Sequence, residues 1–354
     1  MLKQASSLLL IDFLKVFAAL LIILHHLSSY GQIAEDAYLV LPQIMTWLFE
    51  YGRYAVQIFL VMAGYLAAQS LSRYADKKFS ANALLKIILN RYLRLFAPYA
   101  AALIFTIVCA YIARFWVNDE FVGESETLSQ FLAHLFFIQG ILGLDSISAG
   151  AWYIAIDWQL YAVLAILLIS FSSYQAVIWF ISIVAVASLL FFNRSGEYEA
   201  YFIYFIGAYG LGVLAYLSKS FQSQGVNRFA KISLVLIGLV IVISSFQQIW
   251  LRNYLAWCVA IILVFWGNAP YPAGTQDNPL FKAISWGSKR SYCAFLIHFA
   301  FILLANTLYI ALSLNEYESG LLAMTFMLGV LVCSVSAANY LYRWIEVPSV
   351  KLKI

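Results

Sequence analysis

The sequence predicts an all-α protein that crosses a membrane about ten times. Hydrophobic residues make up 64% of the chain and charged residues only 11%, and the mean hydropathy is +0.85. These values lie far outside the range of water-soluble domains. Uncharged runs such as 96–113, 158–193 and 232–251 have about the length that a helix needs to cross the hydrocarbon core. The runs are continuously apolar rather than alternating, which excludes a transmembrane β-barrel.

The predicted spans follow these runs along the chain. The first apolar segment contains Asp12 and Lys15 and has no small-residue cleavage site, so we expect it to persist as a helix and not to be removed as a signal peptide. The spans are predicted at 8–28, 47–71, 92–115, 152–172, 175–192, 199–217, 232–250, 253–268, 291–313 and 320–342.

The distribution of basic residues predicts the topology. Cytoplasmic loops are enriched in Lys and Arg. We therefore expect four basic segments in the cytoplasm: the loop with Arg73, Lys77, Lys78 and Lys86, the loop with Lys219, Arg228 and Lys231, the loop with Lys282, Lys289 and Arg290, and the basic tail. Acidic loops around Glu35, Asp119 to Glu126 and Glu316 then face outward. Both termini are therefore predicted to be cytoplasmic. The net charge of +4 reflects these loops and not a surface for nucleic acid.

Segment 128–144 is apolar enough to suggest one more crossing. An extra crossing there would put every later basic loop outside, so we predict a re-entrant or interfacial segment on the outer side. The sequence shows no internal repeat and no low-complexity linker, which predicts a single membrane domain over residues 1–354 without an appended soluble domain. The four cysteines have no CxxC spacing, and no metal site is expected.

Ionisable residues inside spans are costly, and each is a candidate for function. Lys15 and His26 are eleven residues apart in the first span, which puts them on one helix face at about 16 Å separation. A structural alternative is that Lys15 extends to the inner surface and pairs with Asp12, while His26 sits at the outer interface.

Four further clusters carry charge or a titratable ring. Arg91 and Arg94 lie one turn apart at the cytoplasmic start of the third span and could grip phosphates, or serve only as a positive anchor. Asp157 stands among aromatic residues near the outer end of its span, where a carboxylate could exchange a proton or orient a histidine. His298 lies about two turns into its span, and a satisfied buried histidine is the alternative there. The charged end around Glu346 favours a structural role.

Six motifs in order carry a resemblance to a known family. They are Ile11-Asp12-x-x-Lys15 followed by His26, Gly64-Tyr65, Arg91-x-x-Arg94-x-x-x-Pro98-Tyr99, Trp152-x-x-x-x-Asp157-Trp158-Gln159-x-Tyr161, Leu296-Ile297-His298-Phe299 and Ile345-Glu346-x-Pro348. Nearly end to end, the chain resembles the bacterial acyltransferase-3 family of membrane O-acyltransferases.

The resemblance implies transfer of an acyl group, usually acetyl from cytoplasmic acetyl-CoA, to a hydroxyl of a sugar in a lipid-linked or cell-surface glycan, in the bacterial cytoplasmic membrane. Lys15 and His26 occupy the family's basic-residue-x10-histidine motif, and Arg91 and Arg94 its Arg-x-x-Arg motif. His26 is then the predicted general base or the acyl acceptor, and Lys15 lies along the acyl path. We expect Asp157 to orient His26, and Arg91, Arg94 and His298 to bind acetyl-CoA. No metal is implied.

The sequence departs from the family pattern at two positions. Asp157 stands where glutamate is usual, and Gln57 stands where an acidic residue often occurs. The first change is chemically mild, and the second removes any role for an acidic side chain at position 57. A proton-coupled transporter is the alternative from another class, because intramembrane Lys, Asp and His also suit a carrier. A third alternative is an inactive scaffold or flippase-like protein of envelope glycan assembly.

Overall fold

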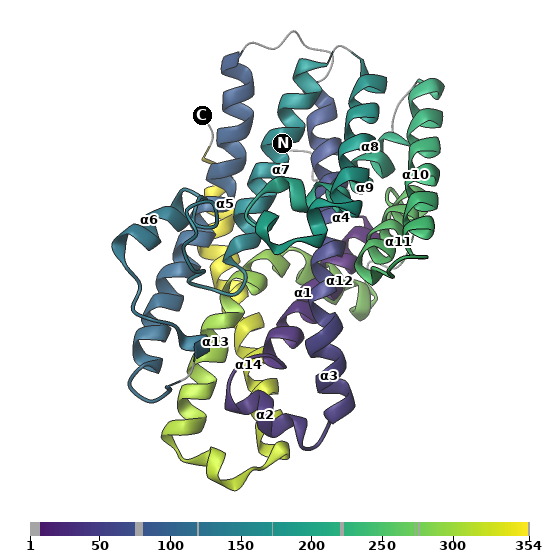
Figure 1. Cartoon of the computed structure of the whole chain (residues 1–354). Helices are drawn as coiled ribbons and strands as arrows, with labels where there is room; N and C mark the ends of the chain where they lie inside the picture. Colours follow the sequence, from purple (N-terminus) through teal and green to yellow (C-terminus); the bar gives the residue numbers. More distant parts are fainter. Residues whose placement is uncertain are drawn as a thin grey trace.

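The computed structural model describes residues 8–74, 81–118, 120–171, 173–219, 223–272, 274 and 277–352. Lys77, Lys78 and Asp119, which entered the topology prediction, lie outside the described residues. Within the described chain the backbone forms helices and turns, and its β-type pairing is a single isolated bridge between Leu8 and Pro270. The all-α prediction is therefore confirmed (Figure 1).

Eight helical segments of the described chain are long and apolar enough to cross a membrane. They are α1 (Leu9–Leu27), Pro42–Tyr74 (α3 Pro42–Tyr51, η1 Gly52–Tyr54, α4 Ala55–Leu71 and η2 Ser72–Tyr74), α5 (Ala81–Ala113), α7 (Ala151–Ser170), Tyr174–Arg194 (α8 Tyr174–Leu190 and η4 Phe192–Arg194), α10 (Gln224–Ser244), α13 (Ser291–Ala311), and Gly320–Ser349 (α14 Gly320–Leu341, the π-helical turn η8 Tyr342–Glu346 and α15 Val347–Ser349).

Two shorter apolar helices, α9 (Phe202–Leu217) and α11 (Leu251–Trp266), bring the total to the ten predicted segments. The chain is a multi-pass membrane protein. The remaining elements are short: α2 (Gln32–Tyr38), η3 (Glu120–Val122), α6 (Leu128–Leu135), η5 (Gly196–Tyr198), α12 (Pro279–Ser288) and η7 (Leu314–Tyr317).

Segment 128–144 forms α6 and a series of turns. The helix begins with a capping box, in which the side chain of Thr127 accepts a hydrogen bond from the backbone N–H of Gln130. Its eight residues are far fewer than a membrane crossing needs. The prediction that this segment makes no separate crossing agrees with this geometry.

Helix α5 differs from the prediction, because it begins at Ala81 and not near residue 92. Residues 81–91 are good helix formers and extend the helix beyond the apolar run (Figure 1). Pro98 lies inside α5, where its ring removes one backbone hydrogen bond. Beside this break the hydroxyl of Tyr292 donates to the carbonyl of Leu95 at 3.0 Å, which joins α13 to α5.

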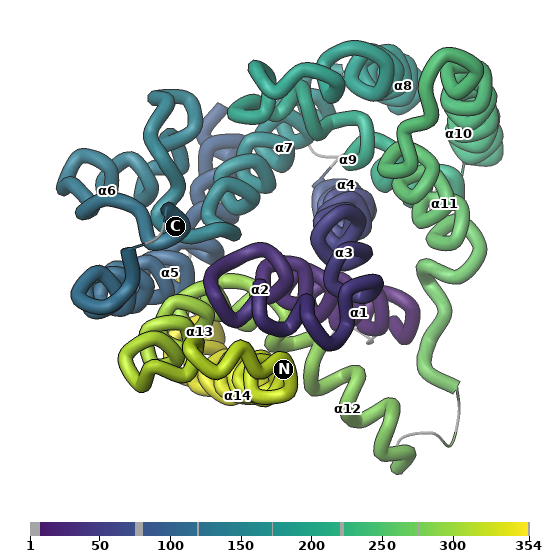
Figure 2. The backbone as a smooth tube through the Cα atoms, turned by 60° about the horizontal axis from the view of Figure 1, so that its bottom comes forward, coloured from purple at the N-terminus to yellow at the C-terminus, as the bar shows by residue number. Residues whose placement is uncertain are grey.

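The centre of the bundle is a close crossing of α4 and α9. A Cβ atom at Gly64 would lie 2.0 Å from the carbonyl oxygen of Tyr209, and one at Gly212 would lie 1.9 Å from that of Val61. Small residues allow such backbone approach between helices in a membrane. Figure 2 shows α4 beside α9, with α8, α10 and α11 beyond them and with α1 between α4 and the α13–α14 pair.

Helix α1 is fixed at both of its ends. Near its start, the carboxylate of Asp12 accepts hydrogen bonds from Ser288 at 2.5 Å and from Tyr271 at 3.0 Å. Just after its end, α2 is tied to α13, since the backbone N–H of Ile33 donates to the side-chain oxygen of Asn306 at 3.1 Å. These bonds hold the last turn of α1, which carries His26, against α13.

Candidate active site

His26 and His298 form a buried pair between α1 and α13. Nδ1 of His26 lies 2.7 Å from Nε2 of His298, and the exposed fraction is 8% for His26 and 0% for His298. Nδ1 of His298 in turn lies 2.7 Å from the carbonyl oxygen of Phe295. The three groups form a continuous hydrogen-bonded chain.

The direction of this chain follows from the carbonyl oxygen, which can only accept. Nδ1 of His298 must therefore carry a hydrogen, which leaves a lone pair on Nε2 of the neutral ring. That lone pair accepts the hydrogen of Nδ1 of His26. Nε2 of His26 then carries a lone pair and no hydrogen, and within the described residues it has no hydrogen-bond partner. A histidine in this tautomer can act as a base or as a nucleophile.

Aromatic rings surround the pair. The ring of Tyr30 lies 5.6 Å from that of His26 and 5.4 Å from that of Phe299. His25, the neighbour of His26 in sequence, points elsewhere and places Nδ1 3.0 Å from the carbonyl oxygen of Leu48. Only one of the two adjacent histidines therefore takes part in the pair.

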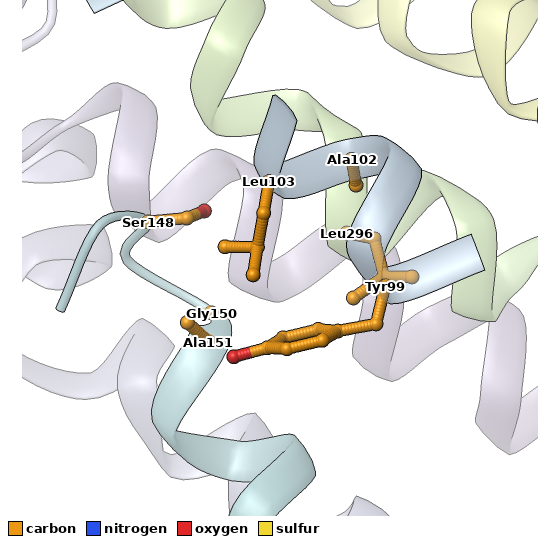
Figure 3. Close-up of a pocket in the computed structure, with 7 residues that line it drawn as sticks. All are labelled: Tyr99, Ala102, Leu103, Ser148, Gly150, Ala151 and Leu296. Atoms are coloured by element: carbon orange, nitrogen blue, oxygen red, sulfur yellow. The ribbon is translucent and has the colours of Figure 1, made fainter. Parts of the chain in front are cut away.

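A small cavity lies between α5, the start of α7 and α13 (Figure 3). It is lined by Tyr99, Ala102, Leu103, Ser148, Gly150, Ala151 and Leu296. Gly150 is packed against Phe295, because a Cβ atom there would lie 2.9 Å from the Phe295 ring. Phe295 is also the residue whose carbonyl holds His298. The cavity therefore adjoins Phe295, the residue whose carbonyl oxygen accepts the hydrogen bond from His298.

The hydroxyl of Tyr99 is the main polar group of this cavity. It points toward the start of α7 beside Ala151 (Figure 3). Tyr99 is 1% exposed, and its hydroxyl has no hydrogen-bond partner in the described part of the chain. Tyr99 ends the Arg-x-x-Arg-x-x-x-Pro-Tyr motif, and no role was predicted for it. A buried hydroxyl without a partner is costly unless a ligand satisfies it.

A second group of charges includes Lys15, Arg91 and Arg94. Arg91 donates to Asp157 at 2.5 Å, and its guanidinium lies 5.1 Å from the ring centroid of Tyr161. Lys15, Arg91 and Arg94 interact electrostatically with one another. Arg94 is exposed although it stands in the middle of α5. Among the described residues neither Arg94 nor Lys15 makes an ion pair.

Asp12 acts electrostatically on Lys15, and Glu346 is another carboxylate that acts on these cations. It lies within electrostatic range of both Lys15 and Arg94, and it accepts a hydrogen bond from the thiol of Cys293 at 3.0 Å. Asp157 forms an ion pair with Arg91, whereas Asp12 and Glu346 act on Lys15 and Arg94 only from beyond ion-pair distance. In the described chain Lys15 and Arg94 are therefore cations without a direct ion pair, which suits an anionic ligand.

The six predicted site residues thus fall into two groups. The structure brings Lys15, Arg91, Arg94 and Asp157 together, and it brings His26 to His298. Asp157 was expected to orient His26, but its hydrogen bond goes to Arg91. His298 was expected with the arginines, but it contacts His26. Asp157 and His298 have therefore changed places relative to the prediction: His298 is the partner of His26, and Asp157 is the partner of Arg91. Asp12 bonds to Ser288 and Tyr271 and makes no ion pair with Lys15.

Comparison with known proteins identifies the family of the chain. A family model described as an acyltransferase domain, that of the acyltransferase-3 family, matches residues 8–342. Neither the comparison with curated proteins nor that with solved structures gave a match. The matched range contains α1, α5, α7 and α13, and therefore both groups of site residues. The chain belongs to the acyltransferase-3 family and is a membrane acyltransferase.

Proposed function

We propose that the protein transfers a short acyl group, acetyl, from acetyl-CoA to a hydroxyl of a sugar in a lipid-linked or cell-surface glycan. The observation that carries the proposal is the hydrogen-bonded chain from the Phe295 carbonyl through His298 to His26. These hydrogen bonds hold Nδ1 of His26 against His298 and leave the lone pair of Nε2 on the opposite side of the ring, free to accept a proton. Family membership favours a transferase over the transporter alternative.

The proposed reaction begins when Nε2 of His26 takes the proton of the acceptor hydroxyl. The hydroxyl oxygen then attacks the thioester carbonyl, the carbon–sulfur bond breaks, and the imidazolium returns the proton to the CoA thiolate. The positive charge on His26 is shared through Nδ1–H with His298, and the aromatic walls limit the access of water.

A covalent route uses the same lone pair as a nucleophile. Nε2 attacks the thioester carbonyl, the carbon–sulfur bond breaks, and CoA leaves as the thiolate from an acyl-imidazolium on His26. The acceptor hydroxyl then takes the acyl group from His26, and its proton neutralises the thiolate. The two routes differ in one observable. Incubation with radiolabelled acetyl-CoA and no acceptor leaves label on the protein only in the covalent route, and that label must disappear in His26→Ala.

The donor is proposed to bind at Lys15, Arg91 and Arg94. Arg94 is exposed and without an ion pair, so its guanidinium is free to hold the CoA phosphates, and Lys15 adds a second charge. Both Lys15 and His26 lie on α1, about 16 Å apart along the helix, a distance that the pantetheine arm can cover. Asp157 then serves to hold Arg91.

The proposed location is the bacterial cytoplasmic membrane, with both termini in the cytoplasm. This orientation rests on the basic loops between spans. It puts the Lys15 end of α1 toward cytoplasmic acetyl-CoA and the His26 end toward an acceptor on the other side.

The test is release of CoA by the purified protein in lipid nanodiscs, given acetyl-CoA and a lipid-linked glycan fraction. We expect wild type to release CoA and His26→Ala to release none above background. His25→Ala is the matched control, because His25 is a neighbour on the same helix that bonds elsewhere. Equal release by wild type and a folded His26→Ala protein would disprove the catalytic assignment.

A further inference from the structure

A cluster of unsatisfied donors lies apart from the site described above. Arg194 ends η4, Trp250 directly precedes α11, and Arg252 lies in the first turn of α11. We call these three residues the Arg194–Arg252 cluster. Two connections that are far apart in sequence, the one after α8 and the one before α11, bring them together.

Both guanidinium groups lie against the same indole. That of Arg194 is 5.3 Å from the ring centroid of Trp250, and that of Arg252 is 4.8 Å from it. A guanidinium at this distance is attracted by the ring face, which gives both cations a neutral partner but no anionic one. No ion pair of either arginine occurs in the described chain. Glu199, which is exposed, interacts with Tyr204, the residue that Arg252 contacts.

The donors of the cluster lack acceptors. Nε and Nη2 of Arg194, Nε of Arg252 and Nε1 of Trp250 are buried and make no hydrogen bond within the described residues. The other nitrogens of Arg252 are used, since they donate to the hydroxyl of Tyr204 at 2.9 Å and to the carbonyl of Asn193. Arg252 is thus held in place, while Arg194 and Trp250 keep unfilled donors. Buried donors normally find a partner, and those of charged groups cost most when they do not.

The chemistry of the cluster selects its ligand. Four unpaired N–H donors and two positive charges gather around one indole, whereas Asn193, which contacts Arg252, contributes one unpaired buried acceptor, Oδ1, in the described chain. A phosphate group supplies several acceptor oxygens and negative charge, and arginine binds it in bidentate fashion.

The cluster is connected to the histidine pair through aromatic rings. The guanidinium of Arg252 lies 5.5 Å from the ring centroid of Tyr204. From Tyr204 an unbroken row of neighbouring rings, with centroids 4.6 to 6.1 Å apart, leads through Phe205, Trp152, Tyr153 and Phe295 to His298. The order of the spans puts both sites on the same side: α1 is the first and Tyr174–Arg194 the fifth of the long spans, so the last turn of α1 with His26 and the end of this span with Arg194 face the same side.

We propose that the Arg194–Arg252 cluster binds the phosphate group of a lipid at the membrane surface on the His26 side. If the proposed function holds, that lipid is the acceptor, with its phosphate on the cluster and its sugar extending along the aromatic row toward His26. The same phosphate chemistry also occurs in phospholipid headgroups. The experiment is therefore designed to separate these two sources.

The experiment is native mass spectrometry of the detergent-solubilised full chain, titrated with polyprenyl phosphate, dioleoyl phosphatidic acid or dioleoylglycerol. Arg194→Gln and Trp250→Phe are the test variants, because their unfilled donors are removed without breaking a protein hydrogen bond. Arg228→Gln is the control, since Arg228 is an exposed arginine on α10. The assay requires no acyl transfer, so it is independent of the proposed reaction.

We expect both phosphate lipids to bind wild type and Arg228→Gln alike and to bind the two test variants about tenfold more weakly. Dioleoylglycerol should bind all four proteins equally. Tighter binding of polyprenyl phosphate than of phosphatidic acid supports the acceptor as the source, and equal binding supports a phospholipid headgroup. Unchanged binding in the test variants, or an equal loss in Arg228→Gln, overturns the proposal.

Discussion

Nδ1 of His26 and Nε2 of His298 share a hydrogen bond of 2.7 Å although the two residues stand 272 positions apart in the chain. The carbonyl of Phe295 accepts the hydrogen on Nδ1 of His298, so Nε2 of His298 must accept the hydrogen on Nδ1 of His26, and this fixes the tautomer of His26. His298 is therefore a positioning residue in the proposed reaction. Its role can be separated from that of a donor-binding residue by kinetics.

Replacing His298 by leucine should lower kcat by about 100-fold, because His26 loses the acceptor that holds its tautomer. KM for acetyl-CoA should change little. His298→Gln should recover part of the rate, since the amide oxygen can accept the same hydrogen bond. Initial rates of CoA release at varied acetyl-CoA measure both parameters. A rise in KM at unchanged kcat would instead assign His298 to the donor site.

Replacing Arg94 by alanine should raise KM for acetyl-CoA about tenfold and leave folding intact. Arg94 is exposed and makes no ion pair in the described chain, so its loss leaves no unpaired charge behind. Lys86→Ala on the exposed early part of α5 is the control and should behave as wild type. Loss of kcat without a change in KM would contradict a phosphate-binding role for Arg94.

Replacing Arg91 by alanine should instead destabilise the protein by about 3 kcal/mol, because it leaves the buried carboxylate of Asp157 without its partner. The double variant Arg91→Ala/Asp157→Asn should recover most of that loss. Thermal unfolding in detergent measures the four proteins of this cycle. If the two single changes simply add in the double variant, the pair is not coupled.

Replacing Tyr99 by phenylalanine should not lower stability and should raise it by up to about 1 kcal/mol, because the removed hydroxyl has no partner. The matched control is Tyr309→Phe, since the buried hydroxyl of Tyr309 donates to Asp36 at 2.6 Å. That control should cost about 1–3 kcal/mol. A fall in the unfolding temperature of Tyr99→Phe would show that the hydroxyl has a partner in the folded protein.

Replacing Gly64 by alanine should disrupt the crossing of α4 and α9, since the added Cβ would lie 2.0 Å from the carbonyl oxygen of Tyr209. Overpacking against backbone costs about 1–3 kcal/mol or more. Gly329→Ala in α14 is the control, because nothing lies within 4 Å of its Cβ position. Yield and unfolding temperature in detergent compare the two, and equal values would contradict the close crossing.

The helices and their order could be predicted from the sequence because each depends on local composition. The runs that became α7 and α13 are apolar over the length of a span, and lipid leaves the backbone no alternative to a helix. In residues 81–91 of α5, Asn and Lys residues interrupt the apolar ones, so hydropathy placed the start of the helix too late although the Ala and Leu residues there favour a helix. His26 and Arg94 could likewise be predicted as site residues, because an ionisable side chain inside a membrane span is costly and they also stand in the six motifs.

The partners of these residues were decided by the tertiary structure. Helical spacing relates Lys15 to His26 along one helix, but it contains no information on which helix packs against α1. Asp157 could have faced His26 and faces Arg91, which lies 66 positions away, and His26 instead meets His298. The same holds for Arg194 and Arg252, whose shared indole joins two separate connections. Hydropathy and spacing determine which segments cross and which residues are unusual, whereas contacts between helices determine what those residues can do.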